Sequence, residues 1–390
     1  YRYSKFMFEF LEGEFGFNYP YELYRQAPLV DYLYGAMETT TATVFGDYMH
    51  VDDRGYFGRN YVNVNAHELV HQWFGNYLSH LSAKDIWLTE SFATYFAKMF
   101  EKEVFGEDYF QNERNNERNR TFNAARKNNY GVGHGRGGVD RWYPKGSLVL
   151  GMLRDVLGDE MFKKSIKHYL EANASEVVET NDFLQAIREA TGKSMEWFFE
   201  QWVYRGGEPH YRVSYKKLQH PNGSEFTQVN VDQIHKTDQV IGLFKMPVEI
   251  EVHYKDRTSD QKTAWIEAIT QVIEIPDPDG KEVAFVLFDP NRKVLKKLSF
   301  DRNADELFAQ ALHAPNMIDR YDALLAMREL DFDKKENTLE EVYKNESFHL
   351  TKAEALRQLL EKPDKEFIEK GINDNDYLVR RVVLEQVEDV

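Results

Sequence analysis

The residues with the clearest capacity for chemistry lie in the segment VNAHELVHQWFGN at 64–76. It contains His67 and His71, separated by three residues, with Glu68 directly after the first histidine. On a helix, residues four apart lie on one face about one turn apart, so both imidazoles can bind one metal ion. Glu68 then leans toward the ion without having to coordinate it. The spacing therefore predicts a helical metal site with a free carboxylate beside it.

A third ligand is available on the next amphipathic segment, DIWLTESFATYFAKMF at 85–100. Glu90 in this segment follows His71 after 18 intervening residues. Two neutral imidazoles and one carboxylate, with the fourth position left to water, are typical of catalytic zinc, whereas structural zinc takes four protein ligands. The chain has no cysteine, so a metal must bind to His, Asp or Glu side chains. We predict one Zn²⁺ per chain, held by His67, His71 and Glu90.

The region that must position these ligands is mainly helical by its pattern. Stretches such as SLVLGMLRDVLG at 147–158 and EWFFEQWV at 196–203 repeat their apolar residues with the helical period. The segment RGGEPH at 205–210 then interrupts the pattern with two glycines and a proline. We therefore predict a first domain over residues 1–207.

The rest of the chain has two further patterns. Between 208 and 300, runs such as YRVSYKKL, TQVNVDQI and MPVEIEVHYK alternate with period two and are separated by turn clusters, which predicts a small antiparallel β-sandwich. Between 301 and 390 the helical period returns, with short polar loops, which predicts stacked helical hairpins of a HEAT-like repeat. This repeat ends without a polar cap, as a truncated one would. The predicted fold class is multidomain α+β.

The composition argues against several partners. There are 49 Lys and Arg residues against 65 Asp and Glu residues, and the formal net charge of −16 repels nucleic acid and anionic lipid surfaces. No apolar run approaches the ~18 residues that a membrane-spanning helix needs. The absence of cysteine excludes disulfide bonds but leaves the compartment open, and our working expectation is a cytoplasmic protein rather than a periplasmic or secreted one.

Four motifs occur in an order that is found in a known family. GAMET at 35–39, HELVHQWFGN, LTESFATY and YPKG at 143–146 together resemble the aminopeptidase N family of gluzincin metallopeptidases. The resemblance covers about residues 1–300 by motif order and the helical tail more loosely. It implies a thermolysin-like, mainly helical catalytic domain, a β-sandwich and a helical superhelical domain. It also implies that a large N-terminal β domain precedes this chain in the full-length protein.

The resemblance assigns roles residue by residue. It makes His67, His71 and Glu90 the zinc ligands, in agreement with their spacing, and Glu68 the general base. The tyrosine of YPKG, Tyr143, is implied to stabilise the oxyanion through its hydroxyl. In GAMET, the carboxylate is implied to bind the free α-amine of a peptide substrate while the preceding backbone lies along the peptide. The substrate-binding residues implied in this way are Gly35, Ala36, Met37 and Glu38.

The sequence departs from the family pattern around these groups. Thr39 stands where the family has Asn, and Pro144 stands where it has Glu. Around the third zinc ligand, the differing positions are Thr89, Ser91 and Ala97. None of these changes removes a catalytic group, but the last three bear on how the zinc ligands are oriented.

The predicted function is a zinc-dependent aminopeptidase that hydrolyses the N-terminal residue from peptides by metal-activated water. Two alternatives stay open. A thermolysin-like endopeptidase would have a similar HExxH and a distant Glu, but it has no use for GAMET. A binding scaffold of this fold without catalysis would have no reason to retain all of the converging groups.

Overall fold

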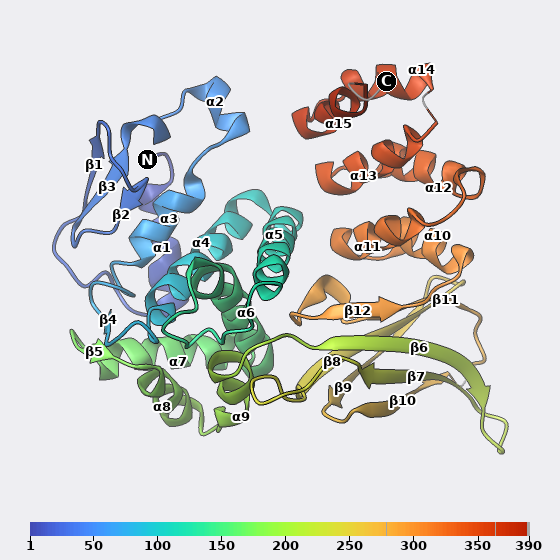
Figure 1. Ribbon diagram of the computed structural model, residues 1–390, viewed down its shortest axis with the longest axis horizontal. Helices are drawn as coiled ribbons and strands as arrows, with labels where there is room; N and C mark the ends of the chain where they lie inside the picture. The colour runs from blue at the N-terminus through green and yellow to red at the C-terminus, as the bar shows by residue number, and fades with distance from the viewer. Residues whose placement is uncertain (278, 363, 388–390) are drawn as a thin grey trace. The chain divides into compact units, whose positions relative to one another are not determined.

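A computed structural model describes residues 1–277, 279–362 and 364–387 (Figure 1). Its contacts divide the chain into two compact units. Unit 1 comprises Tyr1–Glu208 with Lys236–Phe244, and unit 2 comprises Pro209–His235 with the chain from Lys245 onward. The finer sequence-based division into domains at 1–207, 208–300 and 301–390 stays a prediction.

Unit 1 is mainly helical. Its longer helices are α1 (Ser4–Phe15), α3 (Val62–Val70), α4 (Trp87–Phe105), α5 (Glu107–Ala125), α6 (Gly146–Leu157), α7 (Asp159–Ala172) and α8 (Thr180–Thr191). Shorter helical segments are α2 (Asp53–Gly58), α9 (Glu196–Phe199), the 3₁₀ turn η1 (Asp47–Met49) and the π-helical turns η2 (Arg141–Lys145) and η3 (Glu200–Tyr204). Helix α4 is buried along most of its length because its sequence is apolar on nearly every face. It forms the centre of an aromatic core with Phe15, Trp73 and Phe74.

A three-stranded sheet lies in the N-terminal part of unit 1. It consists of β1 (Arg25–Leu29), β2 (Ala36–Met37) and β3 (Ala42–Gly46), in the order β1-β3-β2. Strand β1 runs parallel to β3, and β2 runs antiparallel to it. Strand β2, which contains two GAMET residues, is thus an edge strand of this sheet. A separate pair is formed by β4 (Ser79–His80) and β5 (Val177–Val178).

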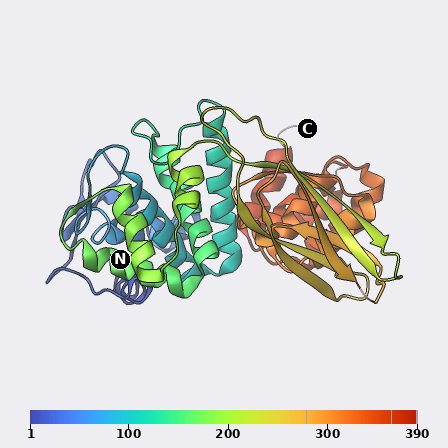
Figure 2. The same ribbon diagram turned by 90° about the horizontal axis from the view of Figure 1, so that it is seen from below.

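The strands of unit 2 form two sheets, with the orders β10-β7-β6-β12 and β11-β8-β9 (Figure 2). Their bounds are β6 (His210–Gln219), β7 (Glu225–Gln233), β8 (Met246–Tyr254), β9 (Ser259–Ile266), β10 (Thr270–Asp277), β11 (Val283–Phe288) and β12 (Lys297–Phe300). The expectation of purely antiparallel pairing is wrong for one pair, because β12 runs parallel to β6. After β11 the chain passes through the turn Pro290–Arg292 to the other sheet, so β12 enters it in the direction of β6.

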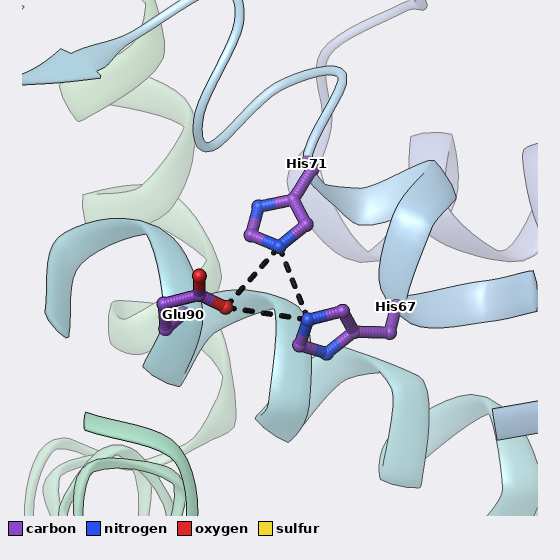
Figure 3. A group of neighbouring side chains, drawn as sticks. All are labelled: His67, His71 and Glu90. Carbon is purple, nitrogen blue, oxygen red and sulfur yellow. Dashed lines mark hydrogen bonds and ion pairs between the residues drawn. The ribbon is translucent and has the colours of Figure 1, made fainter. Parts of the chain in front are cut away.

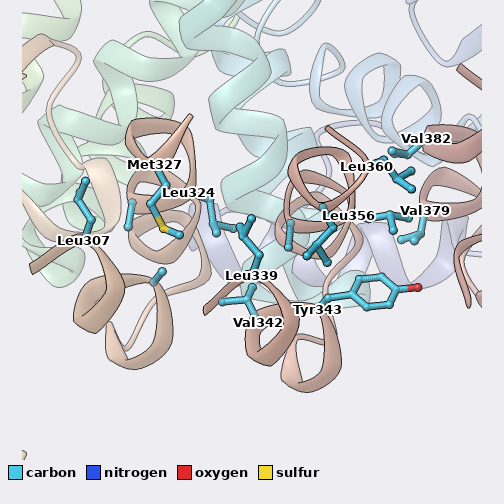
Figure 4. Packing of buried hydrophobic residues seen from close by; sticks show 14 of the residues in the cluster. Leu307, Leu324, Met327, Leu339, Val342, Tyr343, Leu356, Leu360, Val379 and Val382 are labelled. Atoms are coloured by element: carbon cyan, nitrogen blue, oxygen red, sulfur yellow. The ribbon is translucent and has the colours of Figure 1, made fainter. Parts of the chain in front are cut away.

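In the described part of the remaining chain six helices follow, and Figure 1 shows them stacked in consecutive pairs. They are α10 (Ala304–His313), α11 (Met317–Met327), α12 (Phe332–Asn345), α13 (His349–Leu359), α14 (Lys365–Ile372) and α15 (Tyr377–Val387). Their apolar faces share one core, in which Leu324, Leu339 and Leu356 are fully buried (Figure 4). The HEAT-like assignment stays a prediction. No helix in the described ranges is both long enough and apolar enough to span a membrane.

Candidate metal centre

Helix α3 and the first turn of α4 bring three predicted ligands together. His67 lies in the last turn of α3 and His71 directly follows that helix, so the two imidazoles share one face. Their Nε2 atoms are 3.1 Å apart. Glu90, in the first turn of α4, places Oε2 3.3 Å from each Nε2 atom. Figure 3 shows the three atoms forming a small triangle.

The two 3.3 Å separations in this triangle match those of a zinc site, and the 3.1 Å separation between the imidazoles is slightly shorter. For tetrahedral coordination with bonds of about 2.0–2.2 Å, neighbouring ligand atoms lie about 3.3–3.6 Å apart. The ring of His71 is also oriented for binding, because Nδ1 lies 2.9 Å from the carbonyl oxygen of Phe74. In the neutral ring Nδ1–H donates to that carbonyl, which leaves the Nε2 lone pair directed at the cluster. Glu90 Oε2 is buried and has no hydrogen bond within the described part of the chain. These donors therefore fit a cation, and zinc in particular.

The turn after α3 fixes the ring of His71. Gly75 in this turn has φ +145°, and a Cβ atom there would lie 3.1 Å from both Nδ1 and the carbonyl oxygen of His71. The amide of Asn76 donates to the same carbonyl at 3.0 Å. A side chain at position 75 would push against the ligand ring, so this position requires glycine.

Glu68 belongs to helix α3, lies beside the three predicted ligands, and is 7% exposed. Burial raises the pKa of its carboxyl group to about 8, and the carboxylates of Glu38 and Glu90 act in the same direction, while His71 opposes them. Its Oε2 atom has no hydrogen-bond partner among the residues described. A carboxyl group with a pKa near neutrality can both accept and release a proton, as a general base that later acts as an acid must do.

Tyr143 lies in the π-helical turn η2 and faces the same cluster. Its ring is stacked on that of His67, with centroids 5.7 Å apart and planes 9° apart. Burial raises the pKa of the Tyr143 hydroxyl well above its usual range, and the carboxylates of Glu90, Glu68 and Glu38 add to this effect. The hydroxyl therefore stays protonated and can donate a hydrogen bond.

Two buried cations hold the turn that carries Tyr143. The guanidinium group of Arg141 donates to three backbone carbonyls, those of Thr121, Asn128 and Tyr130. The ammonium group of Lys145 donates to the Gly207 carbonyl and to the Glu208 carboxylate, each at 2.9 Å. The Lys145–Glu208 pair is buried, with its side chains 1% and 4% exposed. Irregular helical turns of this kind are frequent at functional sites, and here the two cations stabilise one.

The positions that depart from the family pattern near Glu90 lie in the core. Ser91 donates from Oγ to the carbonyl of Trp142 at 2.5 Å, which ties α4 to the turn that carries Tyr143. Thr89 donates to the Ile86 carbonyl at 2.8 Å, and Ala97 is fully buried. Ser91 thus has a positioning contact that the sequence does not reveal.

The GAMET residues lie on the edge strand β2 and just after it. Gly35 has φ +59°, a left-handed conformation that favours glycine, and its carbonyl accepts from the Gly46 amide at 2.6 Å. Ala36 and Met37 pair with β3. Glu38 is half-buried, and its charge acts on Glu68 and Tyr143, so it belongs to the same electrostatic environment.

Two functional candidates were absent from the sequence-based set. The side chains of Gln72 and Asn76 both donate to the backbone carbonyl of Glu38, at 3.0 and 2.6 Å. The sequence places them beside the second histidine but gives no sign of their partner, which lies more than thirty residues earlier in the chain.

Comparison with known proteins supplies independent information. The model of the Peptidase family M1 domain matches residues 2–202. A leucyl aminopeptidase of Saccharolobus solfataricus is 25% identical over 375 residues, which cover 88% of this chain and 44% of that protein. Tricorn protease-interacting factor F2 of Thermoplasma volcanium is 30% identical over 234 residues, covering 54% of this chain and 29% of that protein. The chain thus spans less than half the length of these relatives.

A solved structure has the same fold. The crystal structure of Legionella pneumophila aminopeptidase A in complex with aspartic acid matches with a TM-score of 0.70 and 17% sequence identity. The match covers 98% of this chain and 46% of that one.

Proposed function

The chain belongs to peptidase family M1, and from that premise we propose that it is a zinc-dependent aminopeptidase, which removes the N-terminal residue from peptides. The observation that carries the proposal is the convergence of two imidazole nitrogens and one carboxylate oxygen to within 3.3 Å of one another. The aminopeptidase names of the relatives support the same reaction class.

His67, His71 and Glu90 would hold the zinc ion. Zinc bound there supplies a Lewis acid, which lowers the pKa of a water molecule and polarises the scissile carbonyl. All three ligands come from the ends of two packed helices, so the protein presents them in a fixed arrangement.

Glu68 moves the proton. As the water attacks the scissile carbon, an oxygen of the Glu68 carboxylate accepts the proton that the water loses. Glu68 then donates this proton to the nitrogen of the leaving amine, which allows the peptide bond to break. Burial of the Glu68 carboxyl raises its pKa and so favours the protonated form that the second step uses.

Tyr143 and Glu38 act on the substrate. The Tyr143 hydroxyl donates a hydrogen bond to the carbonyl oxygen as negative charge develops there, which lowers the barrier most in a water-poor site. The Glu38 carboxylate binds the α-ammonium group of the substrate through a charge-assisted hydrogen bond. Because this contact requires a free amine, it limits cleavage to the first peptide bond.

Metal analysis and turnover together test this proposal. We expect one equivalent of zinc after dialysis, turnover of aminoacyl fluorogenic substrates, loss of turnover with a chelator, and recovery when zinc is returned. His71→Ala should lose the metal, because it removes one of three protein ligands. Turnover that a chelator leaves unchanged would contradict the proposal, as would a full equivalent of zinc in His71→Ala.

A further inference from the structure

The side chain of Gln72 links the turn after α3 to the GAMET segment. Gln72 directly follows His71 and is fully buried. Its Nε2 atom donates to the Glu38 carbonyl at 3.0 Å, and its Oε1 atom accepts from the Thr41 amide at 2.8 Å. The carboxamide thus pairs with this loop as a neighbouring backbone peptide group would.

Asn76 adds a second donor to the same carbonyl. Its Nδ2 atom lies 2.6 Å from the carbonyl oxygen of Glu38, so this oxygen accepts from two side-chain amides. Both amides belong to the turn that orients His71. Within this turn, the backbone N–H of Asn76 donates to the backbone carbonyl of His71, and the backbone N–H of Tyr77 donates to the backbone carbonyl of Gln72. Hydrogen bonds made by Gln72 and Asn76 therefore connect the backbone of Glu38 to the turn that carries His71, a predicted metal ligand.

The loop after Glu38 depends on these contacts because its own geometry is costly. Thr41 has φ +61°, a left-handed conformation that a β-branched residue rarely adopts. The hydrogen bond from its amide to Gln72 offsets part of this cost. The loop is also closed by a bond from the Ala42 amide to the Thr39 carbonyl at 2.8 Å. Without Gln72, we expect the backbone at Glu38 to lose its fixed position.

We propose that Gln72 and Asn76 are positioning residues, which set the distance between the Glu38 carboxylate and the metal ligands and thereby select the first peptide bond for cleavage. This inference rests on the proposed function. One residue of extended chain spans about 3.3–3.6 Å, so the amine and the scissile carbonyl must be bound at a defined separation. A misplacement of about 1 Å at such a site can cost ~100-fold in rate. Both side-chain amides donate to the backbone carbonyl of Glu38, so the role proposed for them acts through Glu38.

Paired inhibitors separate this role from a general structural one. Leucine hydroxamate and its des-amino counterpart, 4-methylpentanohydroxamate, both chelate zinc, but only the first carries an α-amine. The ratio of their inhibition constants therefore measures the contribution of the amine contact. In the unaltered 390-residue chain we expect leucine hydroxamate to bind at least ~10-fold more tightly, as a charge-assisted hydrogen bond allows. Glu38→Ala should reduce the ratio to about one, which is the value expected when the amine contact is absent.

Gln72→Leu and Asn76→Ala should each lower this ratio several-fold toward the value of Glu38→Ala, with Gln72→Leu showing the larger change. Zinc content and the inhibition constant of the des-amino compound should stay within about twofold of the unaltered chain. Gln358→Leu is the matched control, because Gln358 is equally buried and donates to the Leu324 carbonyl at 2.7 Å in unit 2. It should leave the ratio unchanged.

Three results would overturn the inference. Equal weakening of both inhibitors in the Gln72 and Asn76 variants would assign these residues to general stability. An unchanged ratio in a folded, zinc-loaded variant would show that Glu38 keeps its place without them. If Gln72→Leu does not fold, the less buried Asn76→Ala decides by the same criteria. Equal binding of both hydroxamates by the unaltered chain would overturn the proposed function, and the inference with it.

Discussion

The segments that carry Glu38 and Tyr143 are anchored by different kinds of contact. The Glu38 segment is held by two neutral side-chain amides, those of Gln72 and Asn76, which both donate to the backbone carbonyl of Glu38. The Tyr143 segment is held by the buried cations Arg141 and Lys145. A neutral hydrogen bond contributes about 1 kcal/mol, whereas removing one member of a buried ion pair costs about 3–5 kcal/mol. We therefore expect damage to the first anchor to change selectivity, and damage to the second to reduce stability.

Replacing the general base should remove turnover even with both segments intact, because Glu38 and Tyr143 both act on a reaction that needs Glu68. Glu68→Gln keeps the shape of the side chain but has no basic group near neutral pH. We expect kcat to fall by about 10²–10⁴-fold while zinc content is retained. Steady-state kinetics with metal analysis on the same sample checks this. A variant that retains more than about a hundredth of the activity would show that another group is the base.

Breaking the buried ion pair should have the largest effect on stability. Lys145→Met leaves the Glu208 carboxylate buried without its cation, and we expect the free energy of unfolding to fall by about 3–5 kcal/mol. Lys84→Met is the matched control, because the Lys84–Glu179 pair is largely exposed and should contribute under about 1 kcal/mol. Denaturant titrations of both variants make the comparison. Equal losses would show that the buried pair is not a special anchor.

Removing the Tyr143 hydroxyl should act on the transition state. We expect Tyr143→Phe to lower kcat by roughly 100-fold with much less change in KM, because the hydroxyl would bind the developing oxyanion rather than the substrate carbonyl. The fold should be unaffected, since the cations that hold this turn are retained. A rise in KM alone would instead indicate an ordinary substrate contact.

Removing the Glu38 carboxylate should have the smallest of these effects. The lost charge-assisted hydrogen bond corresponds to about 1.5–3 kcal/mol, or roughly 10–100-fold in kcat/KM for substrates with a free amine. Zinc content and stability of Glu38→Ala should match those of the unaltered chain. Unchanged kcat/KM on free-amine substrates would remove Glu38 from the site.

The parts of the site that depend on local spacing could be predicted from the sequence. His67 and His71 lie on one helical face because helix geometry places residues four apart there. The partners of Gln72 and Lys145 could not be predicted, because these side chains bind backbone carbonyls 34 and 62 residues away. A carbonyl has no signature in a sequence, and its position depends on the path of the whole chain.

The fold shows the same limit. The alternating strands of unit 2 were recognisable from their period, as in β8, whose burial alternates along its length. The direction of β12 could not be recognised from the sequence, because a strand of four residues carries no information about its partner. The helical signal is also short over α14, which has eight residues, one of them Gly371 with its low helix propensity.

Digestion of one peptide in two forms tests the central claim most directly. The zinc-loaded chain is incubated with a peptide that has a free N-terminus and with the same peptide N-acetylated, and mass spectrometry follows the products. We predict stepwise loss of N-terminal residues from the free peptide and resistance of the acetylated one, because only the free amine can bind Glu38. Internal cleavage of the acetylated peptide at a comparable rate would contradict the aminopeptidase proposal and favour a thermolysin-like endopeptidase.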